Sequence, residues 1–129
     1  DHMAGTLAVR IHDAMLGRGW LEADGRDYAL TPLGEAAMAQ VGVDVAQARQ
    51  RRRRFACACL DWSERRSHLG GALGAALLDT MLRRGWISKD LDSRALSVTK
   101  RGERQFPAFF GKADAHGSVR KCGYATALG

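Results

Sequence analysis

The sequence predicts a mainly helical α+β domain with two pseudo-symmetric, winged-helix-like repeats, each in the order helix, two-stranded wing, helix. Segment 2–21 returns as segment 68–87 at a constant offset of 66 residues. Segment 30–35 returns as 98–103 at an offset of 68, so the second wing contains two extra residues. Two copies are too few for a solenoid, so we expect one compact unit with a pseudo-twofold axis. The identical pairs include His2/His68, Gly5/Gly71, Leu7/Leu73, Asp13/Asp79, Met15/Met81, Leu16/Leu82, Arg18/Arg84, Gly19/Gly85 and Trp20/Trp86.

The first repeat begins with a predicted helix over 2–18, because its apolar residues recur every three or four positions along one face. Gly19 is placed to end this helix in a left-handed conformation. Two short strands are expected at 20–22 and 28–30. The segment 23–26 between them contains an Asp-Gly pair, which favours a hairpin turn and therefore a wing.

A second helix is expected from Thr31, a natural N-cap, to about Val41, where Gly42 ends it. A third helix, capped by an aspartate, is expected over about 44–57 and should join the two repeats. This helix would contain the arginine run 51–54 on one of its faces.

The second repeat predicts the same elements in the same order. A helix is expected over 69–83 with Gly85 as its stop, followed by strands at 86–88 and 95–98. A last helix should run from the cap Thr99 to about residue 110.

These elements divide the chain into a regulatory domain and a tail. The repeats occupy about 1–42 and 60–111 of a domain that covers 1–111. The segment 112–129 lacks periodicity and is rich in small and polar residues, so we expect a flexible tail.

Composition and charge suggest classes of partner without choosing one. The 129 residues suffice for one domain, and 20 Lys+Arg against 14 Asp+Glu give a net charge of +6, which suits DNA without requiring it. The run Arg51, Arg52, Arg53 and Arg54 is either a solvated helix face or a DNA contact. Three cysteines without a secretory signal favour a cytoplasmic setting, and the longest apolar stretch, 69–78, is too short to cross a membrane.

The segment 55–69 between the repeats contains most of the chemically versatile side chains. Cys57 and Cys59 can chelate a metal together only if the segment is extended, and no CxxC pair exists, so we expect structural cysteines, no metal site and no cofactor. A Cys59 nucleophile with His68 as base lacks a recognisable orienting group, and no Gly-rich phosphate loop is present. The chain is therefore not expected to be an enzyme.

The run 58–74, together with 84–86 and 30–34, resembles the C-terminal region of a bacterial subgroup of ArsR-type winged-helix transcriptional regulators. In that subgroup a helix-turn-helix DNA-binding domain precedes this region. The resemblance covers about residues 1–111, and Ser67 stands where a proline is common. It implies regulation of transcription without identifying an inducer. The residues that match the subgroup motif are Cys59, Asp61, Trp62, Glu64, Arg65, Arg66 and His68.

The leading hypothesis is a C-terminal regulatory domain that senses a small effector, forms a dimer, or both, and acts through a DNA-binding domain outside this chain. Two adjacent arginines between the repeats can clamp an anionic effector. One alternative is direct binding of duplex DNA through 51–54 and the wings; another is a thiol or metal sensor at Cys57 and Cys59. The candidate effector-binding residues are His2, Cys59, Asp61, Trp62, Arg65, Arg66 and His68.

Overall fold

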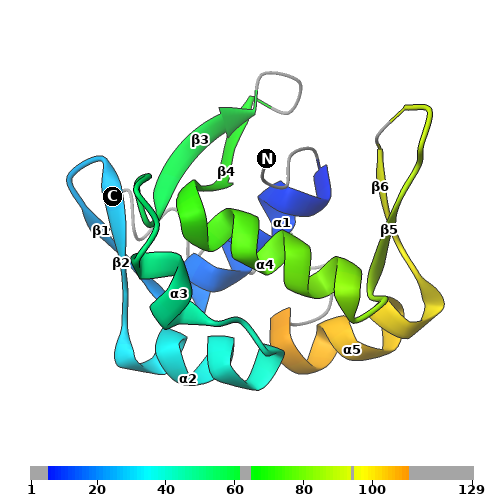
Figure 1. Ribbon diagram of the computed structural model, residues 1–129, viewed down its shortest axis with the longest axis horizontal. Coiled ribbons are helices and arrows are strands. Elements are labelled where there is room, and N and C mark those ends of the chain that lie inside the picture. Colours follow the sequence, from blue (N-terminus) through cyan, green and yellow to red (C-terminus); the bar gives the residue numbers. More distant parts are fainter. Residues whose placement is uncertain (1–5, 62–64, 94, 111–129) are drawn as a thin grey trace.

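The computed structural model describes residues 6–61, 65–93 and 95–110, without the side chain of Asp61. Within these residues the chain forms five helices, a four-stranded antiparallel sheet and a two-stranded hairpin (Figure 1), which confirms the α+β class. In chain order the elements are α1 (Thr6–Gly17), β1 (Leu21–Asp24), β2 (Asp27–Leu30), α2 (Pro32–Val41), α3 (Val45–Arg49), β3 (Cys57–Asp61), β4 (Arg66–Gly70), α4 (Gly71–Arg83), β5 (Ile87–Lys89), β6 (Leu96–Val98) and α5 (Lys100–Phe110).

The four-stranded sheet has the order β1-β2-β3-β4, and β5-β6 forms a separate hairpin. The pairs β1-β2 and β5-β6 are the two expected wings. β3 joins the first wing beside β2, with Asp27 opposite Cys57, and the Tyr28 N–H donates to the Ala56 carbonyl at 2.9 Å. A strand from the segment between the repeats therefore extends the sheet of the first wing.

The ends of α2 and α3 follow the capping chemistry expected from the sequence. The Gly34 N–H donates to the Thr31 side chain at 3.0 Å, and the Gln47 N–H donates to the Asp44 side chain at 3.0 Å. Gly42 follows α2 with a φ of 101°, in the left-handed region that favours glycine. These three local predictions are confirmed.

Each wing is joined to its flanking helices by the same set of hydrogen bonds. The Thr31 hydroxyl donates to the Gly19 carbonyl at 2.6 Å, and the Thr99 hydroxyl donates to the Gly85 carbonyl at 2.6 Å. The N–H of each threonine donates to the carbonyl of the tryptophan that follows the glycine, at 3.0 Å and 2.9 Å respectively. Gly19 and Gly85 have φ values of 77° and 74°, so the expected left-handed helix stop is present in both.

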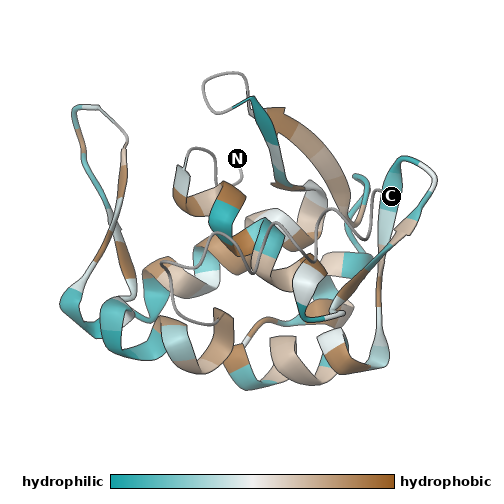
Figure 2. Cartoon of the chain, turned by 180° about the vertical axis from the view of Figure 1, so that it is seen from behind, coloured by the Kyte–Doolittle hydropathy of each residue, from teal (hydrophilic) through white to brown (hydrophobic). Residues whose placement is uncertain are grey.

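Aromatic side chains of α5 pack against the tryptophans of both wings. Trp20 and Trp86 are buried. The Trp86 ring stacks on Phe109 with 5.2 Å between centroids, and the Trp20 ring lies 5.8 Å from that of Phe110. Hydrophobic residues lie along the helices, whereas the first turn of α5 is hydrophilic (Figure 2). Among the described helices, none is both long enough and apolar enough to span a bilayer.

The third helix differs from its prediction over 44–57, because α3 ends before the arginine run and the chain then bends into β3. The carbonyls of Arg54 and Phe55 accept hydrogen bonds from the N–H groups of Ala72 and Leu73, at 2.8 Å and 2.7 Å. These bonds tie the segment to the first turn of α4, so tertiary partners override its local helical tendency.

The helix expected from residue 69 begins instead at Gly71, because 66–70 forms β4 and pairs with β3. Gly71 has a φ of 84°, and a Cβ atom there would lie 2.7 Å from the Arg54 carbonyl oxygen. A glycine is therefore needed for the close turn from strand to helix.

Candidate functional site

The β3–β4 hairpin brings several of the predicted site residues to one face. Cys59 lies opposite His68 and Cys57 lies opposite Gly70 in the register of the two strands. Directly opposite residues of an antiparallel pair point to the same side, and so do residues two apart along one strand. Cys57, Cys59, Arg66 and His68 therefore share a face, and of these only Cys57 lies in a segment that the sequence predicted to be helical.

This face of the hairpin meets α1, where two ionisable residues are buried. His12 and Asp13 are 2% and 7% exposed, and the Arg66 guanidinium forms an ion pair with the Asp13 carboxylate. His12 Nδ1 lies 3.5 Å from Asp13 Oδ1, and His12 Nε2 lies 2.7 Å from the Tyr28 hydroxyl. The cluster thus joins α1, β2 and β4. We call His12, Asp13, Tyr28 and Arg66 the polar cluster.

Three members of the polar cluster, His12, Asp13 and Tyr28, are not among the predicted site residues. In the sequence His12 and Asp13 lie inside a predicted helix and Tyr28 lies in a predicted strand. The available indication was a pair of ionisable residues inside an otherwise apolar helix, since such groups are seldom buried without partners.

The two members of the Asp13–Arg66 pair differ in their access to solvent. The Asp13 side chain is 4% exposed, whereas the Arg66 side chain is 41% exposed. A buried carboxylate is costly unless it is paired, so Arg66 offsets the desolvation of Asp13 and attaches the hairpin to α1. The arginine is the member that a solute can reach from outside.

The other predicted site residues lie in different environments. His68 is buried, with 3% exposure, beside the half-buried Cys59 on the facing strand. Arg65 is exposed in the turn immediately before β4, with a φ of 55°. The predicted clamp of two free arginines differs from this arrangement, because Arg66 is already engaged by Asp13. His2, the Asp61 side chain, Trp62 and the tail 112–129 lie outside the described part of the chain.

The arginine run is only partly free to contact another molecule. The Arg54 Nε donates to the Asp27 carboxylate at 2.8 Å, and the preceding Arg49 donates to Glu35 at 2.6 Å. Residues 51–53 are exposed in the bend that follows α3. The run is therefore an exposed loop of four arginines, of which Arg54 is paired with Asp27, and not the helix face expected from the sequence.

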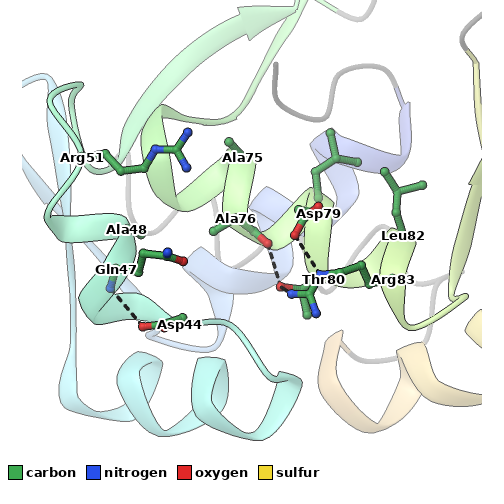
Figure 3. Close-up of a pocket in the computed structure, with 11 residues that line it drawn as sticks. Asp44, Gln47, Ala48, Arg51, Ala75, Ala76, Asp79, Thr80, Leu82 and Arg83 are labelled. Atoms are coloured by element: carbon green, nitrogen blue, oxygen red, sulfur yellow. Dashed lines mark hydrogen bonds and ion pairs between the residues drawn. The ribbon is translucent and has the colours of Figure 1, made fainter.

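An open groove of about 320 Å³ lies between α3 and α4 (Figure 3). Its floor is mostly apolar, and charged side chains of both signs surround it. Arg83 donates to Asp79 at 2.9 Å within the groove. The groove contains none of the residues predicted for the effector site. It is lined by Asp44, Gln47, Ala48, Arg51, Ala75, Ala76, Leu78, Asp79, Thr80, Leu82 and Arg83.

Cys57 and Cys59 are free, half-buried thiols on an extended strand. This is the extended geometry in which two such cysteines point the same way. Across residues 6–61, 65–93 and 95–110, however, no three His, Cys, Asp or Glu side chains are grouped so as to hold a metal ion.

Comparison with known proteins connects the chain to transcription. No protein-family model and no solved structure matches it. The chain is 38% identical over 106 residues to the uncharacterized HTH-type transcriptional regulator YdfF of Bacillus subtilis (strain 168). The match covers 82% of this chain and 47% of the relative, so the chain spans about half the length of the curated relative it matches. This similarity supports a place in a family of transcriptional regulators and agrees with the expectation that the chain is not an enzyme.

Proposed function

We propose that this chain is the C-terminal regulatory domain of a bacterial DNA-binding transcriptional regulator of the ArsR type. It senses a small effector, mediates dimerisation, or both, while a helix-turn-helix domain outside this chain contacts DNA. Two findings support the proposal: the motif resemblance over 58–74, and the similarity to about half of an HTH-type regulator.

The polar cluster is the observation that favours an effector-sensing role. When a buried carboxylate loses its arginine partner, its charge is left uncompensated, which destabilises the contact. An anionic effector that reaches Arg66 competes with Asp13 and so weakens the attachment of β4 to α1. Arg65 is exposed next to it and adds a second positive charge on the approach. The remaining predicted site residues, including His68 and Cys59, would surround the bound group.

The two helix-wing-helix units are, in this proposal, winged-helix-like repeats related by a pseudo-twofold axis. The support is local: both units have the same glycine stop, the same threonine hydrogen bonds and the same order of elements. The division into repeats at about 1–42 and 60–111 remains a prediction.

A thermal-shift titration tests the effector proposal directly. The probes are inorganic phosphate and small mono- and dicarboxylates, added to the wild-type chain and to Arg66→Gln and Arg83→Gln. We expect at least one anion to change the melting temperature of the wild type and of Arg83→Gln, but not that of Arg66→Gln. Arg83 is the matched control because its ion pair with Asp79 is exposed. The same anion response in all three proteins would count against a site at Arg66.

Direct binding of duplex DNA is the second candidate function, and the exposed arginines at 51–53 favour it. Fluorescence anisotropy of this chain with duplex DNA at several salt concentrations separates the two candidates. Direct binding predicts an affinity that falls steeply with salt and is lost when the three arginines are changed to alanine. A regulatory domain alone predicts feeble association that is insensitive to sequence.

The third candidate, a thiol or metal sensor, depends on Cys57 and Cys59. Their common face on β3 supports it. Metal analysis of protein purified without chelators decides this case, since a sensor of this kind should retain metal that Cys59→Ser loses.

A further inference from the structure

The two wings differ at their tips. In the first wing two residues, 25 and 26, separate the last paired positions of β1 and β2. In the second wing four residues, 91–94, separate Asp90 from Ala95, and the Asp90 N–H donates to the Ala95 carbonyl at 2.9 Å. The two residues by which the second wing exceeds the first therefore lie at its tip.

The longer tip presents a large apolar side chain to solvent. Leu91 is 92% exposed, more than any other large hydrophobic residue in the described part of the chain. Asp92 follows it, and its carboxylate has no ion-pair or hydrogen-bond partner among the residues that the structure describes. Figures 1 and 2 both show the β5–β6 wing standing away from the helices. Because single exposed leucines are ordinary on protein surfaces, Leu91 indicates a contact only if a matching surface exists.

The groove between α3 and α4 is such a surface. Its volume of about 320 Å³ leaves room for a leucine side chain. Three of its apolar residues, Ala75, Ala76 and Leu82, are only half-buried, so the floor is still in contact with solvent. A leucine placed there would remove apolar surface of both partners from water, which is the main favourable contribution to association.

The charges around the groove are not equally compensated. Asp44 accepts a hydrogen bond from the Gln47 N–H, and Asp79 forms an ion pair with Arg83. The exposed Arg51 side chain, in contrast, has no ion-pair or hydrogen-bond partner within the described residues. Figure 3 shows its guanidinium group directed from the end of α3 towards α4. An uncompensated cation therefore lies beside the apolar floor, as an uncompensated carboxylate lies beside the apolar tip.

We infer that the β5–β6 wing of one copy inserts Leu91 into the groove between α3 and α4 of a second copy, where Asp92 pairs with Arg51. Leu91 is exposed and the groove is open in the same structure, so the two surfaces do not meet within one chain. Each copy has one such tip and one such groove. A twofold arrangement in which each copy inserts its tip into the other therefore gives a closed dimer.

This inference rests on the dimerisation that the proposed function includes, and it names the surfaces that meet. It is independent of effector sensing, because Arg66 does not line the groove. The apolar contact supplies most of the affinity, while the charge pair sets the register of the tip in the groove.

Sedimentation velocity over a range of protein concentrations tests the apolar contact. We expect the wild-type chain to dimerise and Leu91→Ser to raise the dimer dissociation constant about tenfold or more. Leu33→Ser is the matched control, because Leu33 is a second exposed leucine, 59% exposed, and lies on α2 outside the groove. Its dissociation constant should equal that of the wild type. Circular dichroism checks that both variants keep the fold, as expected for exposed positions.

A charge exchange tests the register of the contact. Arg51→Glu and Asp92→Lys should each weaken the dimer several-fold, and the double variant should restore it, because the opposite charges then face each other again. Arg52→Glu is the control, since Arg52 is exposed but does not line the groove.

Three outcomes separate this inference from the proposed function. A dimer that Leu91→Ser leaves unchanged, or a double variant as weak as the single variants, would overturn the inference and leave dimerisation standing. A wild-type chain that remains monomeric at every concentration would overturn both the inference and dimerisation through this chain. Neither result bears on the effector site, which the thermal-shift titration at Arg66 tests separately.

Discussion

Asp13 and Asp79 occupy equivalent positions in α1 and α4, which the sequence repeat matches, and yet they have different roles. Asp13 is buried and holds the β3–β4 hairpin through Arg66, while Asp79 forms an exposed pair with Arg83 one turn away on its own helix. The helices and their stops are alike, so the difference comes from the strand that covers one helix and not the other. The role of each aspartate therefore depends on whether a strand covers its helix, as β4 covers α1.

The largest effect is expected from breaking the covered pair. Arg66→Ala leaves the Asp13 carboxylate buried without its partner and should lower the free energy of unfolding by about 3 kcal/mol, the low end for a broken buried pair because Arg66 is itself partly exposed. Arg83→Ala, which breaks the exposed pair, should cost no more than about 0.5 kcal/mol. Urea denaturation of both variants measures the difference. Equal losses would show that the two aspartates are not as distinct as their burial indicates.

A loss of stability of similar size in both units is expected at Gly34 and Gly102, the glycines whose N–H groups donate to the capping threonines Thr31 and Thr99. A Cβ atom on Gly34 would lie 2.3 Å from the Trp20 carbonyl oxygen, and one on Gly102 would lie 2.0 Å from that of Trp86. Gly34→Ala and Gly102→Ala should each lower the free energy of unfolding by about 2 kcal/mol, because the wing must shift from its helix. Chemical denaturation measures both. A large loss in only one variant would contradict the structural equivalence of the two turns.

A smaller and again matched effect is expected from the threonine caps. Thr31→Ala and Thr99→Ala each remove a hydroxyl that donates to a glycine carbonyl and accepts from a helix N–H. Each change should cost about 1 kcal/mol, as for other N-caps. Serine variants at the same positions keep the hydroxyl and serve as controls, with melting temperatures near that of the wild type. If the serine variants were as unstable as the alanine variants, the loss of stability would come from the threonine methyl group and not from the hydroxyl.

The smallest effect is confined to the second wing. The pKa of Asp90 is lowered, first because the Asp92 N–H donates to its carboxylate and also because of a hydrogen bond from the Ser93 backbone. A lowered pKa means that the turn is stabilised above the ordinary carboxyl pKa and loses this support as the pH falls through the lowered value. In an acid titration followed by NMR, the Asp92 amide should shift further in the wild type than in Asp90→Ala, because only the wild type loses the hydrogen bond to the Asp90 carboxylate.

Local rules predicted much of this fold. The glycine stops at 19 and 85, the caps at 31 and 99 and both wings depend on residues within a few positions of one another, so the sequence contains their cause. The arginine segment was predicted to be helical because its neighbouring residues do not show that its carbonyl groups accept hydrogen bonds from the first turn of α4.

The candidate site was less predictable for the same reason. Arg66 was identified from its chemistry, but its partner Asp13 on α1 lies 53 positions away in the chain. Whether an aspartate is covered or open depends on a strand from a distant part of the chain. No spacing within a single helix reveals such a contact.

The joining of β3 to β2 has a consequence for how the molecule unfolds. The sheet of the first wing is completed by a strand that precedes the second helix-wing-helix unit, and α5 packs on the tryptophans of both. Neither half can separate without exposing the other's core, so the domain should melt in one cooperative transition, with calorimetric and van't Hoff enthalpies that agree.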